Sequence, residues 1–75
     1  ETFEKSGYIA SVGYDKFTIR DQVYRISPSA KLKSNDANRK KFSDFKKGDE
    51  IYFKGKILNG VHYVDFILYE TPTPS

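Results

Sequence analysis

The sequence predicts an all-β protein, a small barrel of five antiparallel strands with one short helical turn before the fourth strand. Apolar residues recur at every second position, and no helical period lasts longer than one turn. Asn59-Gly60 separates two such alternating segments, as in a two-residue hairpin turn. The chain has no Cys, so its aromatic residues, 16% of the total, must supply the core.

The first half of the chain predicts three strands, at Phe3 to Val12, Phe17 to Arg20 and Val23 to Ile26. Gly7 lies inside the first strand, so we expect that strand to bend. Asp21-Gln22 is the expected turn between the second and third strands. This turn places Phe17 opposite Ile26 on the inner face.

The middle of the chain is polar. Ser27 to Lys41 has few apolar residues beyond Leu32, which predicts a long connection without regular structure. Phe42 to Phe45 then predicts a single helical turn, with its two Phe residues as anchors. Gly48 is expected to take a positive φ and to redirect the chain into the fourth strand.

The last two strands form the best specified part of the fold. Their turn at Asn59-Gly60 sets the register, because a two-residue type I′ turn leaves one pairing of the flanking residues. In that register Phe53 lies opposite Phe66 in the core. Lys54 then lies opposite Asp65 on the outer face, so turn, apolar pattern and charge agree.

Residues 1–70 therefore predict one barrel domain, OB-like or SH3-like in strand order, because closing a sheet removes its unpaired edges. Residues 71–75, Thr-Pro-Thr-Pro-Ser, are typical of an interdomain linker. The chain has no Met and begins at Glu1, which indicates a domain excised from a longer protein. We expect a monomer without a membrane span.

Four segments of the chain carry a family resemblance: Gly7 to Val12, Phe17 to Ile19, Val23 to Leu32 and Phe42 to Asp49. In these segments the chain resembles the small β-barrel domains of bacterial exported and cell-envelope proteins. Those domains include short accessory proteins of type IV pilus biogenesis and related families of unknown function. The resemblance implies a periplasmic or extracellular location and a non-catalytic role, and it assigns no functional residue.

The sequence offers no catalytic or metal-binding group. His62 is the single His, and no Cys is present to share a metal ion with it. The carboxylates lie mostly at turns or opposite lysines, without a spacing that suits acid–base catalysis. No Gly-rich phosphate loop is present. We therefore expect no enzyme activity and no cofactor.

Two groups of residues are candidates for binding. The first is the outer face of the last hairpin, with Tyr52, Lys54, Lys56, Tyr63 and Tyr69. The second is an anion-binding patch that consists of Lys31, Lys33, Arg39, Lys40, Lys41, Lys46 and Lys47. Those seven basic residues and two acidic ones give the Lys31 to Lys47 segment a charge of +5, whereas the whole chain carries +3.

Three functions are compatible with these surfaces. The first is an assembly module of an exported protein, in which the tyrosine face contacts a protein partner. The second is single-stranded nucleic-acid binding of the OB-fold type, through stacking and positive charge. The third is carbohydrate binding, for which the absence of Trp is unfavourable.

Overall fold

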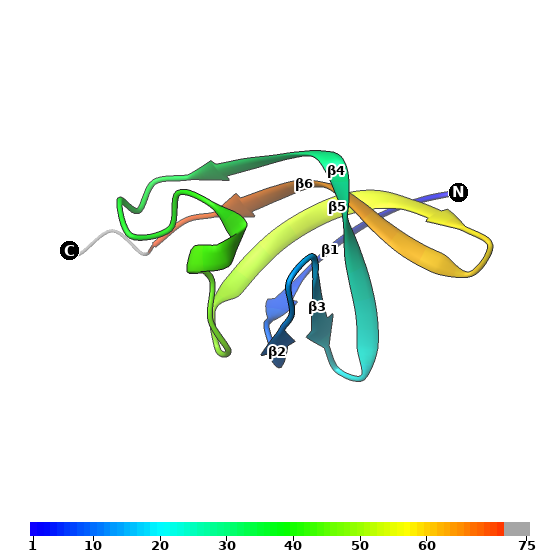
Figure 1. Cartoon of the computed structure of the whole chain (residues 1–75), viewed down its shortest axis with the longest axis horizontal. Coiled ribbons are helices and arrows are strands. Elements are labelled where there is room, and N and C mark those ends of the chain that lie inside the picture. Colours follow the sequence, from blue (N-terminus) through cyan, green and yellow to red (C-terminus); the bar gives the residue numbers. More distant parts are fainter. Residues whose placement is uncertain (72–75) are drawn as a thin grey trace.

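A computed structural model describes residues 1–71, so the predicted linker lies outside them except for Thr71. Six strands form one curled sheet (Figure 1): β1 (Thr2–Tyr8), β2 (Ser11–Val12), β3 (Lys16–Ile19), β4 (Gln22–Ser34), β5 (Glu50–Leu58) and β6 (Val61–Tyr69). A 3-10 turn, η1 (Phe42–Asp44), precedes β5. The predicted all-β, barrel-like fold with one helical turn before the last two strands is confirmed.

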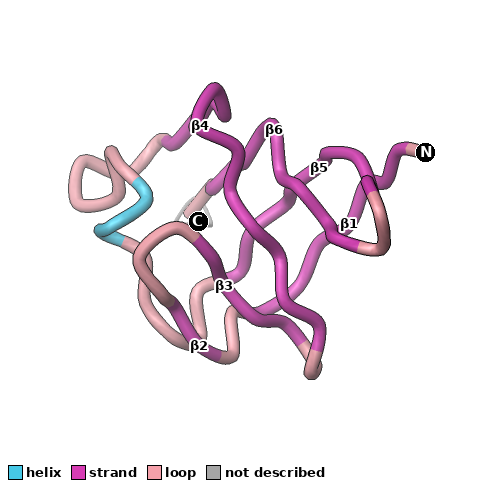
Figure 2. The backbone as a smooth tube through the Cα atoms, turned by 45° about the vertical axis from the view of Figure 1, so that its right-hand side comes forward, coloured by secondary structure: helices cyan, strands magenta, loops and turns pink. Residues whose placement is uncertain are grey.

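The sheet has the order β1-β5-β6-β4-β3-β2, and it curls so that one face encloses the core (Figure 2). Four of its pairings are antiparallel, but β4 and β6 run parallel. The expectation of a wholly antiparallel sheet is therefore wrong. A parallel pair needs a crossover rather than a hairpin. Here the chain passes from β4 through residues 35–49, which include η1, and then through β5 before it returns as β6.

The first predicted strand changes partner in its middle, which is why the structure has six strands instead of five. Ile9 still bonds to the residue before β5, since its N–H lies 2.9 Å from the carbonyl oxygen of Asp49. The N–H of Ala10 instead lies 2.7 Å from the carbonyl oxygen of Thr18 in β3. At this point the chain leaves β5 for β3, so β1 and β2 are two halves of one bent path that joins the ends of the sheet.

The turn between β3 and β4 lies one residue earlier than predicted. Arg20 and Asp21 occupy it, with φ of 51° and 68°, as a type I′ turn requires. Phe17 therefore pairs with Tyr24 rather than with Ile26. The partner of Phe17 thus moves by two residues along β4. Because side chains alternate with a period of two, Phe17 still faces the core.

β4 extends to Ser34, so the prediction of an irregular connection from Ser27 onward is wrong for its first half. Pro28 disfavours a strand interior because it has no N–H to donate. The strand nevertheless continues past it through a bulge between Ile26 and Lys31. Bulges are the places where a sheet tolerates Pro, so the proline shapes the strand without ending it.

A second irregularity lies in β6, where Asp65 has no partner in β5. Gly55 pairs with Val64 as predicted, but the next pair is Lys54 with Phe66. An extra residue exchanges the two faces of all that follows it, because side chains alternate along a strand. Phe66 therefore faces outward. Ile67, which is 2% exposed, lies opposite Phe53 in the core, where Phe66 was predicted to lie.

The core consists of buried apolar side chains from β3, β4, β5 and β6, from the link between β1 and β2, and from the residue after η1: Ile9, Phe17, Ile19, Tyr24, Phe45, Ile51, Phe53, Val64 and Ile67. Phe53 is central, since its ring lies 5.2 Å from that of Phe17 and 4.7 Å from that of Tyr24, both edge to face. These edge-to-face contacts stabilise the fold beyond the contribution from the apolar area that each ring buries.

The two phenylalanines of the predicted pair should differ sharply in their effect on stability. Phe53→Ala removes a side chain that is 1% exposed and should lower the free energy of unfolding by about 3 to 5 kcal/mol. Phe66→Ala removes a half-buried outer side chain and should cost about 1 kcal/mol. Urea denaturation of both variants measures the difference, and equal losses would contradict the bulge at Asp65.

Gly55 should tolerate no side chain. An added Cβ would overlap the carbonyl oxygen of Tyr63 and lie 2.8 Å from its carbonyl carbon, and backbone atoms cannot move aside as side chains do. We expect Gly55→Ala to destabilise the protein by at least about 2 kcal/mol. Gly7→Ala is the matched control, since its Cβ would meet only the side chain of Ile19, at 3.1 Å. A Gly55→Ala variant as stable as this control would refute the close approach of β5 and β6.

Candidate binding face

The outer surface of β3, β4, β5 and β6 gathers basic and aromatic side chains in register. We call this surface the cationic–aromatic face. Its first row across the sheet contains Lys16, Arg25, Tyr63 and Lys56. Its second row contains Lys31, Phe66 and Lys54, and its third row contains Lys33, Leu68 and Tyr52.

Along the strands, the side chains of the face form one aromatic and apolar column with a basic column on each side. β6 contributes a column of half-buried aromatic and apolar side chains: Tyr63, Phe66 and Leu68. Exposed basic residues flank this column on both sides, with Arg25, Lys31 and Lys33 in β4 and Lys54 and Lys56 in β5. Adjacent strands lie about 4.8 Å apart, so the columns are in reach of one ligand. The ammonium of Lys54 is 5.4 Å from the centre of the Phe66 ring.

Among the residues that the structure describes, the basic side chains of this face have no acidic partner within ion-pair distance. Among residues 1–71, the ion pairs within 4.0 Å both belong to Arg39. Lys16 even pairs directly with Arg25 across the strands. Like charges in opposed positions destabilise a sheet, so this pair has no structural benefit and is available to an anion.

Carboxylates also lie within the face and at its margins. Asp65, exposed in the bulge, is the one within it. Glu4 lies at the margin opposite Lys54, and it accepts a hydrogen bond from the Tyr52 hydroxyl. That bond to Glu4 raises the pKa of the Tyr52 phenol, so Tyr52 stays a neutral donor tied to β1.

A shallow hollow of about 480 Å³ opens beside Tyr63. Pro28 from the β4 bulge lies on one side of it, and Leu58 and Val61 from the hairpin lie on the other. Leu58 is 50% exposed. The hollow thus offers an apolar wall next to an aromatic ring and next to Lys56.

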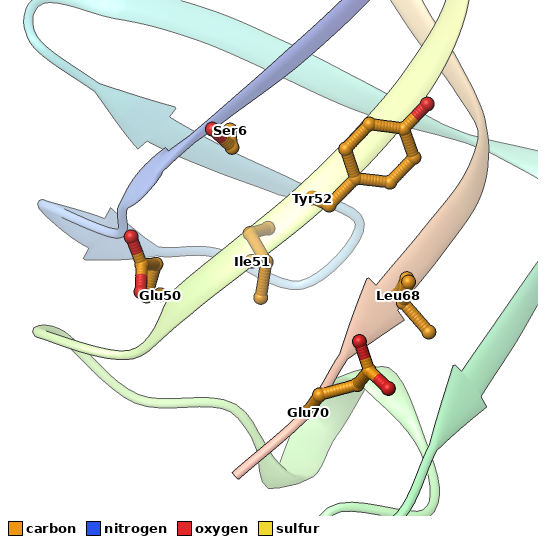
Figure 3. Close-up of a pocket in the computed structure, with 6 residues that line it drawn as sticks. All are labelled: Ser6, Glu50, Ile51, Tyr52, Leu68 and Glu70. Carbon is orange, nitrogen blue, oxygen red and sulfur yellow. The ribbon is translucent and has the colours of Figure 1, made fainter. Parts of the chain in front are cut away.

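The opposite end of the face is acidic. Figure 3 shows Tyr52 and Leu68 on neighbouring strands, with the carboxylates of Glu50 and Glu70 at the same end of the sheet. Both glutamates are exposed. The cationic–aromatic face therefore has a positive end near Tyr63 and a negative boundary beyond Tyr52, so a charged chain would lie on it in an oriented way.

The structure divides the predicted tyrosine face. Tyr52, Lys54, Lys56 and Tyr63 share the outer surface as expected. The placement of Tyr69 with them is wrong, because the bulge at Asp65 turns it inward. Tyr69 packs against Phe45, with 5.5 Å between ring centres, and against the buried core.

The predicted basic patch is also divided. Lys31 and Lys33 belong to β4 and lie on the cationic–aromatic face. The remaining members lie on the crossover between β4 and β5: Arg39, Lys40, Lys41, Lys46 and Lys47. Sequence reasoning did not connect Lys31 and Lys33 with the tyrosines, because their proximity depends on the parallel pairing of β4 and β6. It also missed Lys16, Arg25 and Phe66 as members of the face.

Arg39 holds the crossover in place. Its Nε and Nη2 donate to the carboxylate of Asp49 at 2.8 and 3.0 Å, and its guanidinium lies 5.5 Å from the centre of the Tyr69 ring. These hydrogen bonds raise the pKa of Arg39 and lower that of Asp49. A guanidinium already engaged in this way is less available to a ligand than the lysines of the face.

His62 has structural contacts. Its ring packs edge to face with Phe3 and Tyr24, each with 5.3 Å between ring centres, and its Nδ1 lies 3.3 Å from Nε2 of Gln22. Within residues 1–71, no three His, Cys, Asp or Glu side chains are grouped as a metal ion would require. The same residues include no helix with the length and apolar character to cross a membrane.

Comparison with protein-family models, with curated proteins and with solved structures finds no match to this chain. The side chains of the cationic–aromatic face are therefore the basis on which we infer its function.

Stability should fall in acid because of Asp49. Arg39 lowers the pKa of this carboxyl below its ordinary value of 3.8, so the stability that it contributes is present above that value and is lost as the pH falls through the lower folded-state pKa. We expect Asp49→Asn to be less stable than the wild type near neutral pH and the difference to shrink below about pH 4. Urea titrations at several pH values measure it, and a difference that does not change with pH would contradict the Arg39 contact.

Proposed function

We propose that this domain is a non-catalytic binding module for an extended polyanion, and that single-stranded nucleic acid is the ligand class that its face suits best. The observation that carries the proposal is the column of Tyr63, Phe66 and Leu68 between two columns of basic residues, which form no ion pair within residues 1–71. Lysines and arginines attract phosphates, and aromatic rings provide surfaces on which bases stack.

Nucleic acid is favoured over other anions because it uses both components of the face. An acidic protein segment would neutralise the lysines but would leave the aromatic column without a stacking partner. A neutral sugar would stack on Tyr63 but would gain nothing from Lys31 and Lys54. A single strand places a charged group and a flat base in every repeat, which matches the alternation of columns.

The strand order supports the OB-like alternative over the SH3-like one. With β1 and β2 counted as halves of one bent strand, five strands form a partly open barrel whose first strand pairs with both the second and the fourth. OB folds bind oligonucleotides on a sheet face and on the adjoining loops. We infer the same general mode here, with the face extended onto β6.

An exported or envelope location stays a prediction from the family resemblance. In that setting the polyanion would be extracellular nucleic acid or an anionic glycan, which share negative charge and differ in their bases. The predicted contact with a protein partner through the tyrosines also stays a prediction, now on a surface that excludes Tyr69.

The test is a titration with single-stranded oligothymidylate at several salt concentrations. We expect amide shifts at Tyr63, Phe66 and Lys54, and an affinity that falls with salt. A Lys31→Gln/Lys54→Gln variant should bind at least about tenfold more weakly, and the slope of its salt dependence should flatten by about 0.7 for each phosphate that it no longer neutralises. Phe66→Ala, whose side chain lies outside the core, should weaken binding by about 1 to 3 kcal/mol.

The matched control is Lys40→Gln/Lys41→Gln, which removes the same charge from the crossover. It should bind almost as the wild type does, because neither lysine lies on the face. If it weakens binding as much as the Lys31/Lys54 variant, only net charge matters and the proposed face is refuted. Dextran sulfate that binds as tightly as oligothymidylate, with no effect of Phe66→Ala, would favour a glycan instead.

A further inference from the structure

The outer edge of β1 has free backbone groups. In an antiparallel pair, alternate residues bond to the partner strand and the others point away from it. Ile57 donates to the carbonyl oxygen of Glu1 at 2.8 Å, and Ile9 donates to that of Asp49 at 2.9 Å. The odd-numbered residues of β1 therefore bond to β5, and the even-numbered ones present their N–H and C=O groups to the other side: Thr2, Glu4, Ser6 and Tyr8.

On that other side the barrel is open. β3 pairs with β2, and the N–H of Ala10, just before β2, lies 2.7 Å from the carbonyl oxygen of Thr18. β3 does not pair with β1 itself, although the side chain of Ile19 lies against Gly7. No strand pairs with the outer edge of β1 anywhere in the part of the chain that the structure describes, where β1 stands at the end of the strand order. β1 and the β3–β4 hairpin are thus close together near Ala10 and move apart from there. We call the gap between β1 and this hairpin the seam.

The seam contains a hollow of about 280 Å³ that is lined by Lys5, Ser6, Ile19, Arg20, Gln22, Tyr24 and Phe53. Tyr24 and Phe53 belong to the buried core, so they form an apolar floor. Lys5 shares the inner face of β1 with Phe3, since it pairs with the core residue Phe53. A lysine on the inner face of an edge strand is a recognised obstacle to unselective strand pairing.

Basic side chains lie on both sides of the seam. Lys5 lies on one side and Arg20 on the other; both are exposed, and neither forms an ion pair within 4.0 Å among residues 1–71. Asp21 follows Arg20 in the turn, and Glu4 is engaged by Tyr52 on the outer face. A strand that enters the seam with a carboxylate would therefore neutralise charge that the protein leaves unpaired.

We propose that the seam binds an extended segment of a partner protein, which adds to β1 as a further strand. The segment carries an acidic side chain two positions from an apolar one, because alternate residues of a strand face the same side. The apolar side chain fills the hollow over Tyr24 and Phe53, and the carboxylate contacts Lys5 and Arg20. Backbone bonds to an exposed edge and side-chain pockets together are a common mode of peptide recognition.

This site differs from the cationic–aromatic face in both position and chemistry. The seam opens to the inside of the barrel between β1 and β3, whereas Tyr63 and Phe66 lie on the outside of β6. The two ligands therefore occupy different surfaces, and failure of either proposal leaves the other standing.

The first measurement needs no ligand. Hydrogen exchange of the free protein should be fast at the amides of Glu4 and Ser6 and slow at those of Lys5 and Gly7. A short capped peptide in which Thr alternates with Leu and Glu is the probe, and it should slow exchange at Glu4 and Ser6. A peptide of the same composition in shuffled order, and one with Lys in place of Glu, should bind at least tenfold more weakly.

Two pairs of variants locate the contact. Ser6→Pro removes an N–H that points into the seam without removing a bond to β5, and it should abolish peptide binding, whereas Ser6→Ala should not. Arg20→Glu should weaken binding at least tenfold, and Lys47→Glu, a like change on the crossover, should leave it unchanged. Arg20 lies in an exposed turn, so this pair stays informative even if Ser6→Pro fails to fold.

Several outcomes would overturn the proposal. Slow exchange at Glu4 and Ser6 in the free protein at all concentrations would show that the edge is already covered. Slow exchange that appears only as the protein concentration rises would identify a second copy of this chain as the occupant. Equal binding of the alternating and shuffled peptides, or unchanged binding by Arg20→Glu, would show that no strand enters the seam.

Discussion

One unpaired residue, Asp65, decides which side chains of β6 face the core and which face solvent. Before it, Val64 points inward; after it, Ile67 and Tyr69 do so, and Phe66 turns outward. Gly55 makes this possible, because the backbone of Tyr63 occupies the space where any other residue would place its Cβ. The core and the cationic–aromatic face are thus two results of the same bulge.

The parallel pairing of β4 with β6 supplies the second half of the face. Residues that are far apart in the sequence, such as Lys31 and Phe66, become neighbours only through it. The crossover that permits this pairing is held by Arg39 between Asp49 and Tyr69, the residue that the bulge turns inward. The bulge, the crossover and the surface are therefore linked by direct contacts.

Local chemistry allowed much of this fold to be predicted from the sequence. Asn59 and Gly60 take the positive φ that the hairpin turn needs, and Gly48 takes one before β5. The prediction failed where a single residue changed the register, and Gly55 was the available signal, since a glycine within a strand often marks a bulge. The parallel pair had no local signal at all. Lys31 and Lys33 were therefore predicted as basic binding residues, but their position beside the aromatic column, and the membership of Lys16 and Arg25, could not be predicted.

We expect the two halves of the face to form at different times during folding. β5 and β6 are joined by a two-residue turn, and such hairpins close within about 1 to 10 μs. The pairing of β4 with β6 closes a longer loop, a step that carries a larger entropic cost and should therefore come later. Until then β6 presents an unpaired edge next to exposed aromatic rings, a combination that promotes aggregation. Lys54 and Lys56, already in place on the neighbouring strand, are positioned to act as gatekeepers that keep the nascent chain soluble during this interval.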